Sequence, residues 1–126
     1  MTLDWLEFDY SEEAEGNGSF DAMAAASPSQ LPALQAEVVC VLDWAHANFG
    51  DPLPPEEGGE WHYELQGVQE VATPLLLAYL PSVGRGGNPG LHHSPGTAGS
   101  PRVTLSLTIG GTPNFCDALR RQFALL

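Results

Sequence analysis

The sequence predicts an α+β fold: a two-layer sandwich in which an antiparallel sheet of about five strands carries two helices on one face. Several short segments alternate apolar and polar residues, as strands with one wet face do. Two other segments repeat apolar residues every three or four positions, as amphipathic helices do. Both helices must then cover the same face of the sheet to bury their apolar stripes. The expected order is strand, strand, helix, strand, strand, strand, helix.

The first strand is expected over residues 6–10, where Leu6, Phe8 and Tyr10 alternate with acids. The Asn17-Gly18 pair that follows is typical of a tight hairpin turn. Residues 20–26 would then return as the second strand. Alanine is poor strand material, so a short helix is the alternative there.

The first helix is expected over residues 31–48 and a third strand over residues 61–66. The helix rests on apolar residues at spacings of three and four, and Gly50 provides its end. Residues 51–60 are rich in proline and glycine and predict a loop. In the third strand, Gly67 shifts the alternation by one before Val68, which predicts a β-bulge. The helical stripe consists of Leu34, Val38, Val41, Leu42, Ala45 and Phe49.

The second half of the chain predicts two more strands and a helix. Residues 74–80 form a short apolar run, which we expect to be a buried or hairpin strand. Nine of the 20 residues in 82–101 are Gly or Pro, so a mobile loop without regular structure is expected there. Residues 103–109 alternate clearly and predict a strand. Thr112 and Pro113 then form the start of a helix that buries Phe115, Leu119, Phe123 and Leu126.

Length and charge restrict the classes of partner. The 126 residues, 43% of them hydrophobic, suit one domain spanning 1–126, and the net charge is −12 without a single lysine. Such a charge disfavours nucleic acids and anionic membranes as partners. The start of the chain is acidic and lacks the features of a signal peptide. Two distant cysteines indicate free thiols in a reducing cytoplasm. The absence of lysine, a single isoleucine at position 109 and the abundance of Ala, Gly, Pro and Leu are typical of GC-rich codons, so we expect a cytoplasmic protein of a GC-rich bacterium.

The acids are unevenly distributed. Fifteen of the 16 lie in residues 1–70, which contain no Lys or Arg. Glu12, Glu13 and Glu15 form the densest group, and they predict either a surface that recruits a basic protein or an ordinary solubilising face. Part of this segment has the spacing of a calcium loop, but Ala24 stands where the bidentate glutamate belongs. We therefore expect a plain acidic hairpin and no metal site.

Few residues have the features of a catalytic site. Cys116 lies near the start of the last helix with Arg120 one turn ahead, which would favour a thiolate, but no histidine lies nearby in sequence. Gly110, Gly111 and Thr112 precede the same helix and could hold an anion on free amides. His92 and His93 are adjacent and would point in opposite directions in an extended chain. No cofactor motif is present, and no cofactor is expected.

Three stretches of the chain resemble an uncharacterised family of small acidic bacterial proteins. They are residues 3–12 (LDWLEFDYSE), residues 18–24 (GSFDAMA), and residues 104–108 (TLSLT) together with Gly111-Thr112-Pro113. The resemblance implies a single domain and brings no activity, cofactor or catalytic residue.

Taken together, these features predict a non-catalytic domain that binds another protein or a copy of itself. The acidic surface and aromatic anchors such as Trp61 would make the contact. The alternative is a small enzyme whose site is assembled from dispersed carboxylates, Cys116 or a histidine. A homodimer or another protein is the expected partner, and neither nucleic acid nor a membrane is.

Overall fold

The structure is a computed structural model that describes residues 1–82 and 87–126. Its regular elements, in chain order, are β1 (Asp9–Glu12), η1 (Ala14–Gly16), β2 (Gly18–Ala26), α1 (Leu31–Phe49), η2 (Pro55–Glu57), β3 (Trp61–Glu70), β4 (Leu75–Leu80), β5 (Gly90–Pro95), β6 (Arg102–Gly111) and α2 (Pro113–Phe123), where η marks a 3₁₀ helix. The α+β class predicted from the sequence is confirmed.

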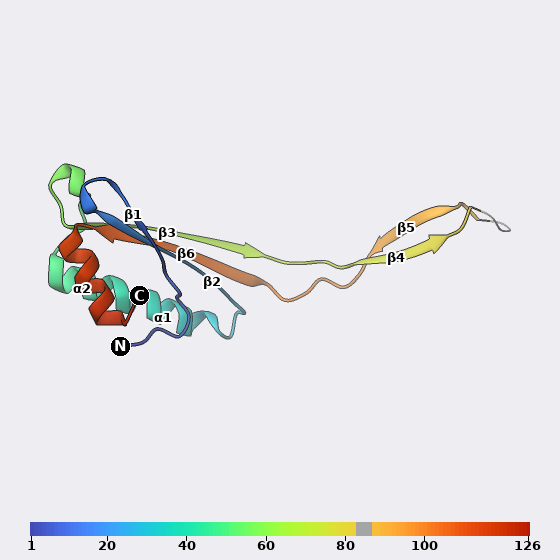
Figure 1. Cartoon of the computed structure of the whole chain (residues 1–126). Helices are drawn as coiled ribbons and strands as arrows, with labels where there is room; N and C mark the ends of the chain where they lie inside the picture. The colour runs from blue at the N-terminus through green and yellow to red at the C-terminus, as the bar shows by residue number, and fades with distance from the viewer. Residues whose placement is uncertain (83–86) are drawn as a thin grey trace.

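Four strands form the main sheet in the order β1-β2-β6-β3, with every neighbouring pair antiparallel. Helices α1 and α2 lie together on one face of this sheet (Figure 1). In the described residues the sheet has four strands instead of about five, because β4 and β5 pair with each other and form a separate two-stranded sheet. In Figure 1 this second sheet projects far from the rest of the molecule.

The core lies between the sheet and the two helices. Helix α1 contributes Leu34, Val38, Val41 and Ala45, which belong to its predicted stripe. Strand β2 is buried at every second residue, so Ala22, Ala24 and Ala26 face the helices and the alternative of a short helix is wrong. Alanine suits this position because its small side chain lets helix and sheet approach closely. The largest fully buried side chains are Trp61, Phe20, Phe115, Phe123, Leu34, Leu107, Ile109 and Leu119.

The first hairpin turns earlier than the Asn-Gly pair predicts. Glu15 and Gly16 have the positive φ values, +63° and +79°. Gly18 already belongs to β2, and a Cβ there would lie 2.4 Å from the ring of Tyr10. The second glycine of the segment is therefore needed for contact with an aromatic ring and not for the turn.

The chain before β1 is held by one carboxylate. Glu37 on α1 accepts backbone hydrogen bonds from Asp4 (2.9 Å), Trp5 (2.9 Å) and Leu6 (2.7 Å). These amides consequently cannot take part in a ladder, and the strand predicted from residue 6 begins only at Asp9. Leu6 is nevertheless buried, as the alternation predicts.

Replacement of Glu37 by alanine should lower the free energy of unfolding by about 1–3 kcal/mol, because three backbone donors lose a charged acceptor. Asp43→Ala is the matched control, since Asp43 is an exposed acid on the same helix and should cost less than about 0.5 kcal/mol. Urea unfolding followed by circular dichroism measures both. Equal losses in the two variants would contradict this role of Glu37.

The bulge predicted at Gly67 is wrong. The pairing of β3 with β6 runs without interruption from Trp61↔Gly111 to Glu70↔Arg102 and includes Gly67↔Leu105. The glycine makes room for a neighbouring side chain, because a Cβ there would lie 3.1 Å from Leu105 Cδ2. Val68 consequently lies on the open face of the sheet, where it is exposed.

Two expectations about the second half of the chain also need correction. Residues 75–80 do form a strand, β4, which pairs with β5 as a hairpin strand, so that alternative is confirmed; the buried alternative is wrong, because every residue of β4 is exposed. The region 82–101 was expected to lack regular structure, yet it contains β5. Pairing with β4 satisfies the backbone, and Gly90 and Pro95 stand at the two ends of the strand, where they are tolerated. Residues 83–86 of the predicted mobile loop lie outside the described residues.

Candidate interaction surface

The feature that distinguishes this molecule is the projection formed by residues 71–82 and 87–101, which we call the arm. The rest of the chain is the body. Within the arm, β4 and β5 are antiparallel, with Leu75 opposite Pro95 and Leu80 opposite Gly90. Figure 1 shows the arm extending along the direction of β3 and β6, away from the helices.

The arm has an apolar face that nothing in the described chain covers. Because successive strand residues point to opposite sides, Leu75, Leu77 and Tyr79 share a face, and the pairing places Leu91 beside Tyr79 on it. These side chains are 57%, 62%, 71% and 67% exposed, respectively. Leu76 and Leu80 lie on the opposite face. Leu75, Leu77, Tyr79 and Leu91 together expose on the order of 600 Å² on this one face, as much as the largest patch on a typical monomer.

The arm is a continuation of the main sheet. Gly96 N donates to Pro74 O and Gly99 N donates to Ala72 O, both at 2.8 Å, so segments 71–74 and 96–101 stay paired between the two sheets. The segment 96–101 is two residues longer than the segment 71–74 opposite it, which shifts the register. Backbone pairing therefore holds the arm in line with β3 and β6 even though its side chains have no core to enter.

A second apolar surface lies on the body beside β3. This strand is at the edge of the sheet, and its outer side carries only the bridge between Leu53 and Trp61 in the part of the chain that the structure describes. Between this edge and α1 lies a hollow of about 420 Å³, which we call the edge groove. It is lined by Gln35, Val38, Val39, Leu65 and Leu105.

The edge groove is lined mainly by apolar side chains, whereas Glu64 and Glu70 of β3 lie on the open face of the sheet. Val39 is 53% exposed and Leu65 is 45% exposed. Long, open, apolar strand edges invite pairing with another chain, so proteins normally cover or charge them. The body thus presents both unpaired backbone groups and apolar side chains at the edge from which the arm extends.

The acidic residues predicted as a binding surface, Glu12, Glu13 and Glu15, lie on the body, at the end of β1 and in the loop before β2. Glu13 and Glu15 line a shallow hollow together with Glu56 from the loop before β3. Glu12 ends β1 and is exposed. Trp61 belongs to the core instead of a surface: it is fully buried, and its Nε1 donates to Gly50 O at 3.0 Å.

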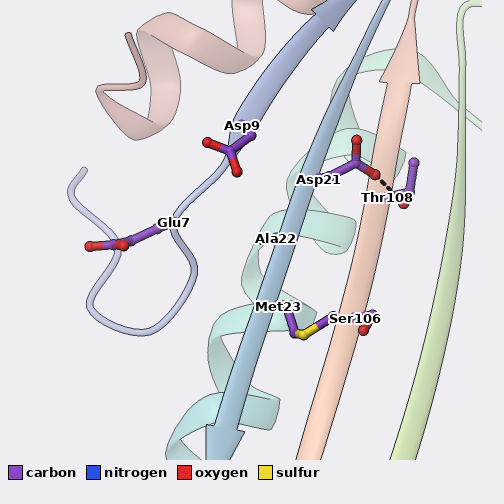
Figure 2. A pocket seen from close by; sticks show the side chains of 7 residues that line it. All are labelled: Glu7, Asp9, Asp21, Ala22, Met23, Ser106 and Thr108. Carbon is purple, nitrogen blue, oxygen red and sulfur yellow. Dashed lines mark hydrogen bonds between the residues drawn. The ribbon is translucent and has the colours of Figure 1, made fainter.

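The structure brings together a further acidic group that sequence reasoning missed. Glu7, Asp9 and Asp21 line a hollow on the open face of the sheet, where Thr108 Oγ1 donates to Asp21 Oδ1 at 2.6 Å. Figure 2 shows that the three carboxylates do not converge on one point, since Glu7 points away from Asp21. Among residues 1–82 and 87–126, no three His, Cys, Asp or Glu side chains form a group that could hold a metal ion.

Cys116 lies buried in the first turn of α2. It is 1% exposed, and its Sγ donates to Gly111 O at 3.6 Å. Burial raises the pKa of this thiol; the hydrogen bond to Gly111 and the charge of Arg120 act in the opposite direction but are weaker. A raised pKa leaves little thiolate at neutral pH, which opposes nucleophilic chemistry.

The predicted anion site at Gly110, Gly111 and Thr112 gains no support. A Cβ at either glycine would lie within 2.3 Å of a backbone oxygen, so close strand packing accounts for both. Thr112 Oγ1 caps α2 by accepting from Phe115 N, and it donates to the Glu60 carboxylate at 2.7 Å. An anion approaching this helix start would meet carboxylates.

The two adjacent histidines lie in β5 and pair with Ala78 and Leu77, so they are on opposite faces of the arm. The Nε2 atom of His92 lies 2.7 Å from Asn88 O. The pair is therefore part of the arm's surface and does not form a chelating site.

No family model, curated protein or solved structure matches the chain significantly. None of the helices in the described residues has the length and apolar character needed to cross a membrane.

Proposed function

We propose that this chain is a protein-binding domain that contacts its partner through the arm. The observation that carries the proposal is the exposed apolar face of Leu75, Leu77, Tyr79 and Leu91 on a two-stranded sheet. An isolated two-stranded sheet is marginally stable in water, and a partner that covers this face would stabilise it. Apolar patches of this size are typical of interaction sites.

The charge distribution supports a division of roles between arm and body. All 16 acids lie on the body, and residues 71–101 contain none. Acids on the body maintain solubility, while their absence from the arm lowers the cost of removing it from water. The contact is therefore assigned to the arm, and the acidic surface limits which molecules approach.

We include in this proposal the expectation of a bacterial, cytoplasmic setting. Cys40 and Cys116 are both free, as suits a reducing compartment.

The test is photo-crosslinking with benzoylphenylalanine placed at Tyr79, in cells that naturally make the chain. We expect protein adducts from this position. The control places the same residue at Asp51, whose side chain is fully exposed on the body, and it should give none. The proposal fails if position 79 gives no protein adduct, or if positions 51 and 79 give the same adducts.

A further inference from the structure

We infer that the partner is a second copy of this chain, with each copy adding its arm to the open β3 edge of the other. This inference rests on the proposed function and names the molecule that the arm binds. The two copies would be related by a two-fold axis near residues 71–74, where the arm leaves the body. The main sheet of each copy would thereby gain β4 and β5 of its neighbour.

The lengths of the two parts match. Strand β3 has ten residues, Trp61–Glu70, and the ascending side of the arm has the same number from residue 71 to the end of β4. At about 3.3 Å per residue, each spans about 33 Å. Because the arm continues the direction of β3 (Figure 1), a two-fold axis at their junction places each arm alongside the partner's body. β4 then runs antiparallel to the partner's β3, as main-chain pairing requires.

Backbone groups are available on both sides of this contact. The outer edge of β3 beyond Trp61 pairs with no strand in the described chain, and β4 pairs with β5 on one side alone. Strand addition at such an edge provides main-chain hydrogen bonds, and side chains in pockets provide specificity.

The side chains are complementary as well. The arm presents Leu77 and Tyr79 on its apolar face, and the edge groove beside β3 presents Val39 and Leu65. In the paired arrangement, the apolar face of the arm extends the helix-covered face of the partner's sheet and lies against α1. The arm would then supply the fifth strand that the sequence predicts, and its exposed leucines would be buried against the partner's α1.

Charge favours this arrangement over a contact between bodies. Each body carries 16 acids in residues 1–70 and 102–126, so two bodies repel each other. The arm brings no carboxylate to the acidic edge that contains Glu64 and Glu70. Only the arm can therefore approach that edge without repulsion between like charges.

The buried area requires that the exchange be reciprocal. One arm supplies on the order of 600 Å², which is below the roughly 1,200–2,000 Å² of a stable interface. Two arms together with two edge grooves reach that range. A closed dimer with both arms engaged is therefore expected, and an open chain of copies is not.

The experiment measures mass by sedimentation equilibrium for the full chain and three variants. The unchanged chain should have twice its mass of 13.4 kDa. The arm variant, Leu77→Ser with Tyr79→Ser, and the groove variant, Val39→Asp, should each raise the dissociation constant at least about 30-fold. Met23→Ser, which removes an equally exposed apolar side chain from the open face of the sheet, should leave it unchanged. Far-UV circular dichroism verifies that every variant is folded.

Mixing the arm variant with the groove variant provides the decisive measurement. The groove variant has an intact arm, and the arm variant has an intact groove, so a mixed dimer regains one of the two contacts. We expect the mixture to associate more tightly than either variant alone.

Several results would overturn the inference. A chain that stays monomeric at all concentrations would do so, and adducts to a different protein at position 79 would then leave the proposed function standing. A dimer that resists Val39→Asp would indicate contact between the two arms. Binding of the monomer to phosphatidylcholine vesicles, lost in the arm variant, would overturn both the inference and the proposed function.

Discussion

Replacement of Phe115 by alanine is expected to lower the free energy of unfolding by about 3–5 kcal/mol, the usual cost of deleting a buried phenyl ring. Phe115 is fully buried at the start of α2. Its ring stacks on Trp61 with centroids 5.8 Å apart and meets Phe49 edge-on at 5.0 Å. It therefore joins α2 to both β3 and α1.

The side chains around the cavity left by Phe115→Ala cannot easily move in to fill it, because they are packed on one another. Trp44 contacts Phe115 from α1, with centroids 6.0 Å apart, and is itself packed on Phe49. Phe115→Leu is the control, because it keeps most of the volume and should cost less than about 1.5 kcal/mol. Chemical unfolding followed by tryptophan fluorescence measures both variants. A loss for Phe115→Ala no larger than that for Phe115→Leu would show that the aromatic cluster is not the centre of the core.

Gly111→Ala is expected to destabilise the fold by at least about 3 kcal/mol, or to prevent folding. Gly111 ends β6 between two strands and pairs with Gly18 on one side and Trp61 on the other. A Cβ there would lie 2.0 Å from Glu60 O and 2.9 Å from Trp61 Cα. Both are backbone atoms, so a clash can be relieved only by separating paired strands.

Gly67→Ala is the matched control for this variant, since Gly67 also lies in the sheet. A Cβ at this position meets only the end of the Leu105 side chain, at 3.1 Å, and that side chain can move. Alanine is moreover preferred over glycine in a strand interior, so the stability should change by less than about 1 kcal/mol in either direction. Urea unfolding of the two variants tests the difference, and similar midpoints would refute the steric account.

The local pattern predicted most of the body correctly. The boundaries of α1 and β6 agree with the sequence prediction within one or two residues, and α2 begins after the predicted cap at Thr112. These segments have strong periodicity and clear end signals, which depend on neighbouring residues alone. The predictions failed at Gly67, which forms no bulge, and at residues 6–8, where Glu37 holds the Leu6 amide and no strand forms. The predicted burial of Leu126 is also wrong, because α2 ends at Phe123 and Leu126 is exposed.

The arm was not predicted as the candidate surface, although one feature of the sequence distinguishes it. Residues 71–101 contain no acid in a chain that has 16. The acidic residues and Trp61 were favoured instead because charge and aromatic rings are easier to recognise. Burial of Trp61 under α1 and α2 could not be read from its alternation with His62, which is the same for a wet and a dry strand face.

Periodicity, helix caps and charge are local properties, so the α+β class, the two helices and the acidic, lysine-free character follow from the residues alone. The position of the apolar run of β4 depends instead on the whole fold. Six consecutive apolar residues have the same pattern whether they enter their own sheet or project from it. Because β4 pairs with β5 and not with a strand of the main sheet, both strands extend away from the body and their side chains are exposed.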